Sequence, residues 1–363
     1  MITRIKTKLL FIFMVLFISC ESTTYKDQET FRLINKKYNA KLNTSYHKGD
    51  TITGLRIYGR YFSELPKEIM DFEYLKALRI DGVNIKKLPD WIKELKQLKT
   101  VTIVDVPFNS FPEELLELDS MEHFSFNGNE LKELPSELHF ENLKSIYLSE
   151  LKIQKLPLLY FNSKEGMSVI LRKTDINEIP NEYRKYRIRE FIIEDNRQLD
   201  HVDNLFGTYD SLKEVKIEYR GHTKFPMESF KKCYNLEVLS LTDQGLWEFP
   251  DFIYQNTKLK RLYIGNNPFE KISSQIIKLQ NLEYLGLYNS LMIADLPEEL
   301  FALPKLEAID IKSTLIGKLP SGIMGLPKRE VPMKIYVSNA PESYVPLGMS
   351  LDELNEKGYI LKN

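Results

Sequence analysis

The feature that most constrains this chain is a phrase repeated every 22 to 24 residues, an apolar residue followed by proline, with an L-x-x-L-x-L pattern roughly nine residues after the proline. The phrase occurs at Leu65-Pro66, Leu88-Pro89, Phe111-Pro112, Leu134-Pro135, Leu156-Pro157, Ile179-Pro180, Phe225-Pro226, Phe249-Pro250, Leu296-Pro297 and Leu319-Pro320. Two further places, Val202-Asp203 and Ile272-Ser273, keep the spacing without the proline. A fixed period of this length is typical of a solenoid, in which one short unit is stacked many times.

A single unit, residues 75–98, contains two different apolar periods. Leu78 and Ile80 alternate with charged residues, which predicts a strand with one buried face. From Pro89 onward, Ile92 and Leu95 follow at steps of three, which predicts a short helical or 3₁₀ return with proline in its first turn. Because no unit can bury its apolar side alone, the units must stack, and their strands must form one parallel sheet along the inner side.

This pattern resembles the leucine-rich repeat family, specifically its 23-residue class with L-P, over residues 50–338. The resemblance implies an α/β solenoid, a horseshoe with a parallel concave β-sheet of about 12–13 strands and short helical or 3₁₀ segments on the convex side. We expect strands at residues 52–57, 75–80, 98–103, 121–126, 143–148, 166–171, 188–193, 212–217, 236–241, 259–264, 282–287, 306–311 and 332–337.

The family usually carries asparagine three residues after the last strand leucine, where the amide bonds the backbone of neighbouring turns. Here only Asn129, Asn196 and Asn267 occupy that position. We therefore do not expect a continuous asparagine ladder. Apolar replacements such as Val83 and Leu151 must fill the turn by packing, which leaves its backbone groups to other partners.

The first nineteen residues read as a signal peptide, since three cations precede a ten-residue apolar run that is too short to span a bilayer. Residues 16–20, ending in Cys20, resemble the lipobox of bacterial lipoproteins, although Phe17 departs from the usual leucine. The resemblance implies that Cys20 is lipidated and tethers the chain to a membrane. Glu21 favours the outer membrane, facing the periplasm or the cell surface. An ordinary cleaved leader and a buried N-terminal segment are the alternatives.

The remaining boundaries follow from where the repeat begins and ends. Residues 20–49 are expected to form a lipidated tether, polar over 21–29, and an N-terminal cap. Residues 50–338 form the repeat domain, and 339–363 a C-terminal cap. In that cap, Ser350 with Glu353 has the spacing of a capping box, and Gly358 marks the helix end. The short helix should cover the last strand.

Composition and motifs argue against several functions. Lys and Arg number 50 against 51 Asp and Glu, so the chain is not basic enough to suggest a nucleic-acid partner. No hydrolase, nucleotide-binding or zinc-protease motif occurs, so we expect no enzyme activity, cofactor or metal site. Whether the irregular segment 194–203 binds a cation stays open. Cys233 has no disulfide partner other than Cys20 and reads as a small buried hydrophobe.

Function is expected on the inner face, where side chains that alternate with the buried leucines align in columns across repeats. Toward the C-terminus, Tyr263, Tyr284, Tyr288 and Tyr336 fall near one another, with Gly265 and Gly286 leaving space between them. Exposed tyrosines are typical anchors of protein contacts, although tyrosine also simply suits a strand. Arg56 and Arg79 begin the middle column and are further candidates. Ile170 and Ile192 place apolar groups in it.

We therefore predict a non-enzymatic, membrane-tethered binding module of the cell envelope that holds a protein or peptide. Two alternatives stay open. One is glycan or nutrient capture, with the tyrosines stacking on sugar rings. The other is a cytoplasmic scaffold, which would apply if the leader is misread.

Overall fold

The computed structural model describes residues 25–38, 41–48, 51–60, 62–196, 211–218, 230 and 233–363. The leader, Cys20 and most of the irregular segment after Asn196 therefore lie outside the described residues. The chain divides into two compact units. Unit 1 comprises residues 1–167 and 173–180, and unit 2 comprises residues 168–172 and 181–363.

Unit 1 contains a sheet in the order β1-β2-β3-β4-β5-β7. Each strand from β2 to β7 pairs in parallel with its neighbour, whereas β1 runs antiparallel to β2. A second sheet pairs β6 with β8. The strands are β1 (Lys41–Lys48), β2 (Thr51–Tyr58), β3 (Ala77–Asp81), β4 (Thr100–Val104), β5 (His123–Asn127), β6 (Glu137–His139), β7 (Ser145–Ser149) and β8 (Leu158–Tyr160).

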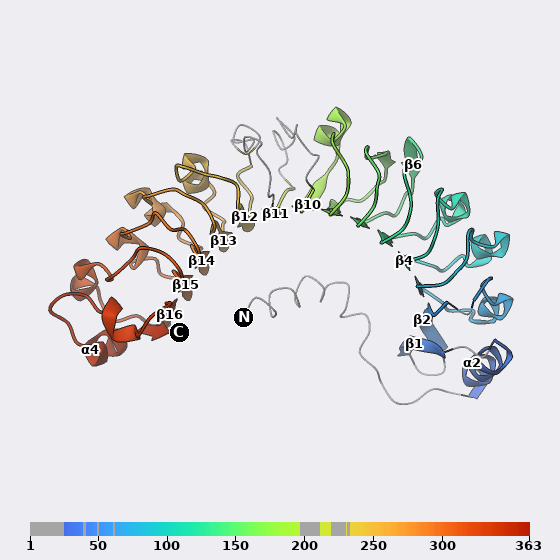
Figure 1. The fold of residues 1–363 in the computed structure, drawn as a ribbon, viewed down its shortest axis with the longest axis horizontal. Coiled ribbons are helices and arrows are strands. Elements are labelled where there is room, and N and C mark those ends of the chain that lie inside the picture. Colours follow the sequence, from blue (N-terminus) through green and yellow to red (C-terminus); the bar gives the residue numbers. More distant parts are fainter. Residues whose placement is uncertain are drawn as a thin grey trace. The chain divides into compact units, whose positions relative to one another are not determined.

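Unit 2 continues the same construction with strands in sequence order, and the pairs from β10 to β17 are parallel. In each unit the strands line the inner side and the 3₁₀ helices lie outside them (Figure 1). The strands are β9 (Met167–Arg172), β10 (Ile188–Glu194), β11 (Glu214–Glu218), β12 (Val238–Ser240), β13 (Arg261–Tyr263), β14 (Tyr284–Gly286), β15 (Ala308–Asp310), β16 (Met333–Tyr336) and β17 (Tyr359–Lys362).

A strand lies within or across each of the thirteen segments that the repeat predicts. Most begin about two residues later than expected, because the first leucine of each segment closes the preceding turn. The Leu75 N–H, for example, donates to the Phe72 carbonyl at 3.1 Å, and the ladder to the next strand starts only after it. The next two apolar residues, Leu78 and Ile80, are buried as the alternation requires.

The returns are 3₁₀ helices, each beginning directly after its proline or, at η7, after Ser273. Proline is thus the residue before the first helical one, rather than the first helical residue. A buried Ile, Leu or Tyr near the third position holds each helix on the core. The helices are η2 (Lys67–Asp71), η3 (Asp90–Glu94), η4 (Glu113–Glu117), η5 (Asn181–Lys185), η6 (Asp251–Gln255), η7 (Ser274–Lys278), η8 (Glu298–Leu300) and η9 (Ser321–Gly325). After Pro135 and Pro157, strands β6 and β8 take their place.

The turns after the strands combine asparagine amides with apolar packing. The Asn267 amide donates to the Leu241 carbonyl at 2.8 Å, and its oxygen accepts the Gln244 N–H at 2.9 Å. Gln244 fills the same role one repeat earlier, donating to the Ile217 carbonyl at 3.1 Å. Val83 and Leu151 are buried, as expected for apolar replacements. The ladder is therefore interrupted by packing and partly extended by glutamine.

The N-terminal end of the repeats is covered by α2 (Tyr25–Lys37) and β1. Ile34 of α2 is fully buried, and the Asp27 carboxylate accepts the Ile52 N–H at 2.5 Å. The expectation of a polar tether through residue 29 is wrong for residues 25–29, because the helix begins at Tyr25. Ile34 packs inward, whereas the basic residues Arg32, Lys36 and Lys37 are exposed.

At the C-terminal end, η10 (Pro341–Tyr344) precedes α4 (Leu351–Glu356), which has the expected capping box between Ser350 and Glu353. The chain then turns at Gly358, whose φ is +88°, and adds β17 alongside β16, a strand that the repeat pattern does not predict. Arg329 donates hydrogen bonds to the backbone carbonyls of Phe301, Leu303 and Leu306. It thereby satisfies carbonyl groups that the repeat itself leaves without a donor.

Candidate functional site

Unit 2 brings three of the predicted tyrosines together on its inner face. Tyr263 of β13 pairs in register with Gly286 of β14, and Tyr284 lies two residues before that glycine. The Tyr263 and Tyr284 ring centroids are 5.0 Å apart with an interplanar angle of 37°. We call Tyr263, Tyr284 and Tyr288 the tyrosine cluster. All three side chains are half-buried, so each ring is held by its neighbours and still presents surface.

The two glycines do not leave open space between the tyrosines, contrary to expectation. A Cβ at Gly286 would lie 3.1 Å from the Tyr284 ring and 3.4 Å from the Tyr288 ring. A Cβ at Gly265 would lie 2.4 Å from the Tyr288 carbonyl oxygen and 3.0 Å from its ring. The rings therefore lean over the glycines and occupy the room that the missing side chains provide.

Hydrogen bonding and burial define the chemistry of the cluster. The Tyr288 and Thr242 hydroxyl oxygens are 3.3 Å apart, which ties the cluster to the strand region before it. Burial, and then the nearby Asp310 carboxylate, raise the pKa of Tyr284 far above its ordinary value. Burial also raises the pKa of Tyr263. The phenols of Tyr263 and Tyr284 are therefore neutral at physiological pH and can donate hydrogen bonds.

Tyr336, the fourth predicted tyrosine, lies two strands from Gly286 in the same column, with Asp310 between them. The Lys312 ammonium lies 5.9 Å from the centroid of its ring. The Asp310 carboxylate accepts the Lys312 N–H at 3.1 Å, and burial raises the pKa of this carboxyl group. Tyr336 is therefore separated from the tyrosine cluster by Asp310.

Arg56 and Arg79, the candidates in unit 1, are occupied by an intramolecular contact. Both guanidinium groups bind the Asp81 carboxylate, Arg79 at 3.1 Å. Arg56 also lies over the Tyr58 ring at 5.4 Å. Two cations sharing one carboxylate form a compact network within the protein, although the Arg56 Nε has no hydrogen-bond partner among the described residues. They are weaker candidates for a partner's acidic groups than cations without such a contact.

Ile170 and Ile192 differ from each other. Ile170 is half-buried, but Ile192 is only 2% exposed, so it does not offer an apolar contact surface. Ile192 pairs in register with Lys216 of β11.

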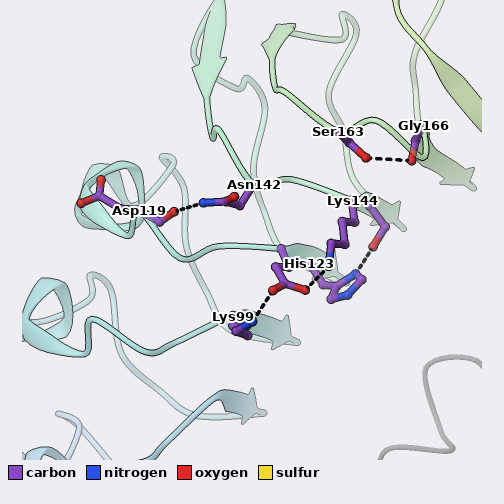
Figure 2. Close-up of polar contacts among 9 residues, drawn as sticks. Lys99, Asp119, His123, Asn142, Lys144, Ser163 and Gly166 are labelled. Carbon is purple, nitrogen blue, oxygen red and sulfur yellow. Dashed lines mark hydrogen bonds and ion pairs between the residues drawn. The ribbon is translucent and has the colours of Figure 1, made fainter.

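Sequence reasoning did not identify a polar cluster on unit 1 around His123 (Figure 2). His123 Nδ1 lies 2.8 Å from Ser145 Oγ. Just before these strands, Lys99 and Lys144 both bind Glu122, the latter at 2.7 Å. Burial alone would raise the pKa of Glu122, but the hydrogen bonds from the two lysines outweigh it and hold the pKa below its usual value. In the sequence, this cluster is indicated by Lys99, Glu122 and Lys144, which alternate in charge at the same position of successive repeats.

Glu214 of β11 carries a strongly perturbed carboxyl group. It pairs in register with Glu190 on β10, so two acidic side chains lie directly opposite each other. Burial, and then the Glu190 charge, raise the pKa of Glu214 to about 7, although Lys216, Arg261 and Arg189 act in the other direction. Glu214 is also close enough to Tyr263 to influence the pKa of that phenol.

Three further features bear on function, namely potential metal ligands, possible membrane spans and the second cysteine. Within the described ranges, no three His, Cys, Asp or Glu side chains converge as a metal site would require. No helix in the described part of the chain combines the length and apolar character needed to cross a membrane. Cys233 is fully buried, and burial raises the pKa of its thiol to about 12, which confirms the reading of a small buried hydrophobe.

Comparison with known proteins gives sequence relatives that match only part of the chain. No protein-family model matches the chain. Receptor-like protein 41 of Arabidopsis thaliana is 29% identical over 140 residues, which is 37% of this chain. The chain spans only 16% of the length of that protein.

Solved structures that are similar over most of the chain include an internalin and a Toll complex. An internalin, InlF, from Listeria monocytogenes has a TM-score of 0.53 and 14% identity, with 85% of this chain and 86% of that chain covered. The Toll–Spatzle complex of Drosophila contains a chain with a TM-score of 0.54 and 16% identity, with 83% of this chain and 50% of that chain covered. Similarity at this identity concerns the fold. Together with the parallel strands, 3₁₀ returns and buried leucines, it shows that the chain has the leucine-rich repeat solenoid fold.

Proposed function

We propose that this chain is a non-enzymatic binding module that holds a protein or peptide on the inner face of unit 2. The observation that carries the proposal is the tyrosine cluster, three half-buried rings packed over two glycines. Large aromatic groups that are already ordered lose little conformational freedom on binding and contribute much of the contact energy at protein interfaces. The similarity to Toll in its complex with Spatzle agrees with this role.

We also propose that the chain is a lipoprotein of the cell envelope, anchored to the bacterial outer membrane through Cys20. The proposal rests on the order of cations, apolar run and cysteine in the first twenty residues. Membrane fractionation of the wild-type chain and of Cys20→Ser tests it. We expect the wild type in the membrane fraction and the variant outside it. A wild-type protein that is soluble and has the same mass as the variant would instead support a cytoplasmic scaffold.

The binding proposal is tested by affinity capture with residues 21–363 as bait. A triple variant, Tyr263→Ala with Tyr284→Ala and Tyr288→Ala, should lose a protein that the wild type retains, since it removes the aromatic contact area. The matched control replaces Tyr160 and Tyr234, which are exposed and lie outside the inner face. A partner that survives the triple variant and is lost from the control would refute the assignment of the surface.

Glycan capture is the second candidate, favoured by the tilted Tyr263–Tyr284 ring pair, since such rings can stack on sugars. Sugar binding should survive moderate salt and fail on Tyr263→Ala or Tyr288→Ala. A charge-steered protein contact should instead weaken as salt increases. A glycan array probed at two salt concentrations separates the two candidates.

A further inference from the structure

Three cations stand around the tyrosine cluster without a carboxylate at ion-pair distance among the described residues: Arg261, Lys312 and Lys334. Arg261 of β13 pairs in register with Tyr284 of β14. Lys334 of β16 lies in the same column, two strands beyond Tyr284. Both cations are exposed. The Lys312 ammonium lies over the Tyr336 ring and also interacts electrostatically with the Asp310 carboxylate. Elsewhere in unit 2, by contrast, Lys213 and Lys260 both bind Glu237, at 3.1 Å and 2.8 Å.

Asp310 is the single acidic residue at the inner-face register positions of β13 to β16. With three cations around it, this set of four strands carries an excess of positive charge, although Arg261 also interacts with the Glu214 carboxyl group, which lies in the same column on β11. In unit 1 the two arginines of the corresponding face already share Asp81. On strands β13 to β16, the positive charge without a carboxylate at ion-pair distance therefore lies beside the tyrosine cluster, where neutral phenols can also donate hydrogen bonds.

We propose that this surface binds an acidic, extended peptide segment, with its carboxylates at Arg261, Lys334 and Lys312 and its chain across the tyrosine rings. The inference rests on the proposed binding function and adds the chemistry of the partner. Arginine suits carboxylates because its planar fork donates two parallel hydrogen bonds. An excess of about two charges is small compared with the roughly six to ten phosphate contacts of nucleic-acid-binding proteins, so a peptide fits better than RNA.

The sheet geometry also sets the spacing of the acidic residues. Arg261 and Lys334 occupy strands β13 and β16, three strand spacings apart. At about 4.8 Å per spacing, their backbones are about 14 Å apart. An extended peptide advances about 3.4 Å per residue, so two acids about four residues apart reach both cations.

The test uses the full chain and three fluorescein-labelled synthetic peptides of Gly and Ser. They carry Glu, Gln or Lys at two positions four residues apart. Fluorescence anisotropy should show the tightest binding for the Glu peptide, weakening several-fold as salt rises, because exposed charges are screened. Arg261→Glu with Lys334→Glu should weaken that binding by roughly tenfold or more. Lys258→Glu with Lys278→Glu, the same charge change outside the inner face, should leave it unchanged. Asp310→Asn should strengthen it.

The outcomes separate this inference from the proposed function. If the Lys peptide binds best and its binding needs the tyrosine cluster, the acidic partner is overturned while the binding surface stands. If a single-stranded RNA displaces the Glu peptide and binds more tightly, the partner class is wrong. If the tyrosine triple variant binds the Glu peptide as the wild type does, both proposals fail. If no peptide binds at all, the acidic partner is overturned, and affinity capture with the tyrosine triple variant still decides the proposed function. If the variant with Arg261→Glu and Lys334→Glu does not fold, Arg261→Gln with Lys334→Gln removes the same two positive charges by a milder change and should also weaken binding of the Glu peptide.

Discussion

Glu214 makes the stability of unit 2 depend on pH in an unusual direction. Its carboxyl group lies opposite Glu190, and burial with that like charge raises its pKa from 4.5 to about 7. A carboxyl group with a raised folded pKa favours the protonated folded state, so stability is lost as pH rises from 4.5 toward 7. The full shift corresponds to about 3 kcal/mol. Because solvent reaches part of the side chain, we expect about 1–2 kcal/mol.

Replacing Glu214 with Gln removes the ionisable group and keeps its shape. Urea unfolding should therefore show Glu214→Gln equal to the wild type near pH 4 and more stable by about 1–2 kcal/mol near pH 8. Glu237→Gln is the opposite control. Hydrogen bonds from Lys260 and Lys213 lower the pKa of Glu237, so this variant should be less stable near pH 8 and approach the wild type in acid. A stability difference for Glu214→Gln that does not change with pH would refute the reasoning.

The remaining predictions concern close packing and turns, all measured by thermal or urea unfolding. Gly265→Ala should destabilise the protein by about 1–3 kcal/mol because its Cβ would meet backbone, whereas Gly317→Ala, which meets nothing within 4 Å, should be neutral. Equal stability of the two variants would contradict this. Asn267→Ala should cost about 2–4 kcal/mol by leaving several backbone groups unbonded, and a loss below 1 kcal/mol would argue against the role of the amide. Gly82→Ala, with φ at +61° and open space around it, should cost about 1 kcal/mol from backbone strain alone, and no loss would contradict that reading.

The repeat spacing was enough to predict the strands, because alternation around Leu78 and Ile80 decides which face is buried. It could not predict β1 and β17, since neither segment carries the repeat pattern and each forms by pairing with the strand beside it. It also could not show that α2 reaches back to Tyr25, because a mainly polar helix of this kind depends on a few inward contacts such as Ile34.

The candidate site was predictable only as columns of residues. The columns correctly brought Tyr263 and Tyr284 together, since register follows from the repeat. They could not show that the rings would turn over Gly286, because side-chain direction depends on neighbours in other columns. The pairing of Arg79 with Asp81 could have been foreseen, as the two lie two residues apart on the same face.

The central claim, that the inner face of unit 2 meets the partner, is tested most directly by site-specific photocrosslinking in the cells that produce the protein. A photoreactive phenylalanine analogue is placed at Tyr288 or, as the matched control, at Tyr160, which is 46% exposed on β8. We expect a covalent adduct of higher mass from position 288 and none from position 160. Adducts from position 160 with none from position 288 would contradict the claim.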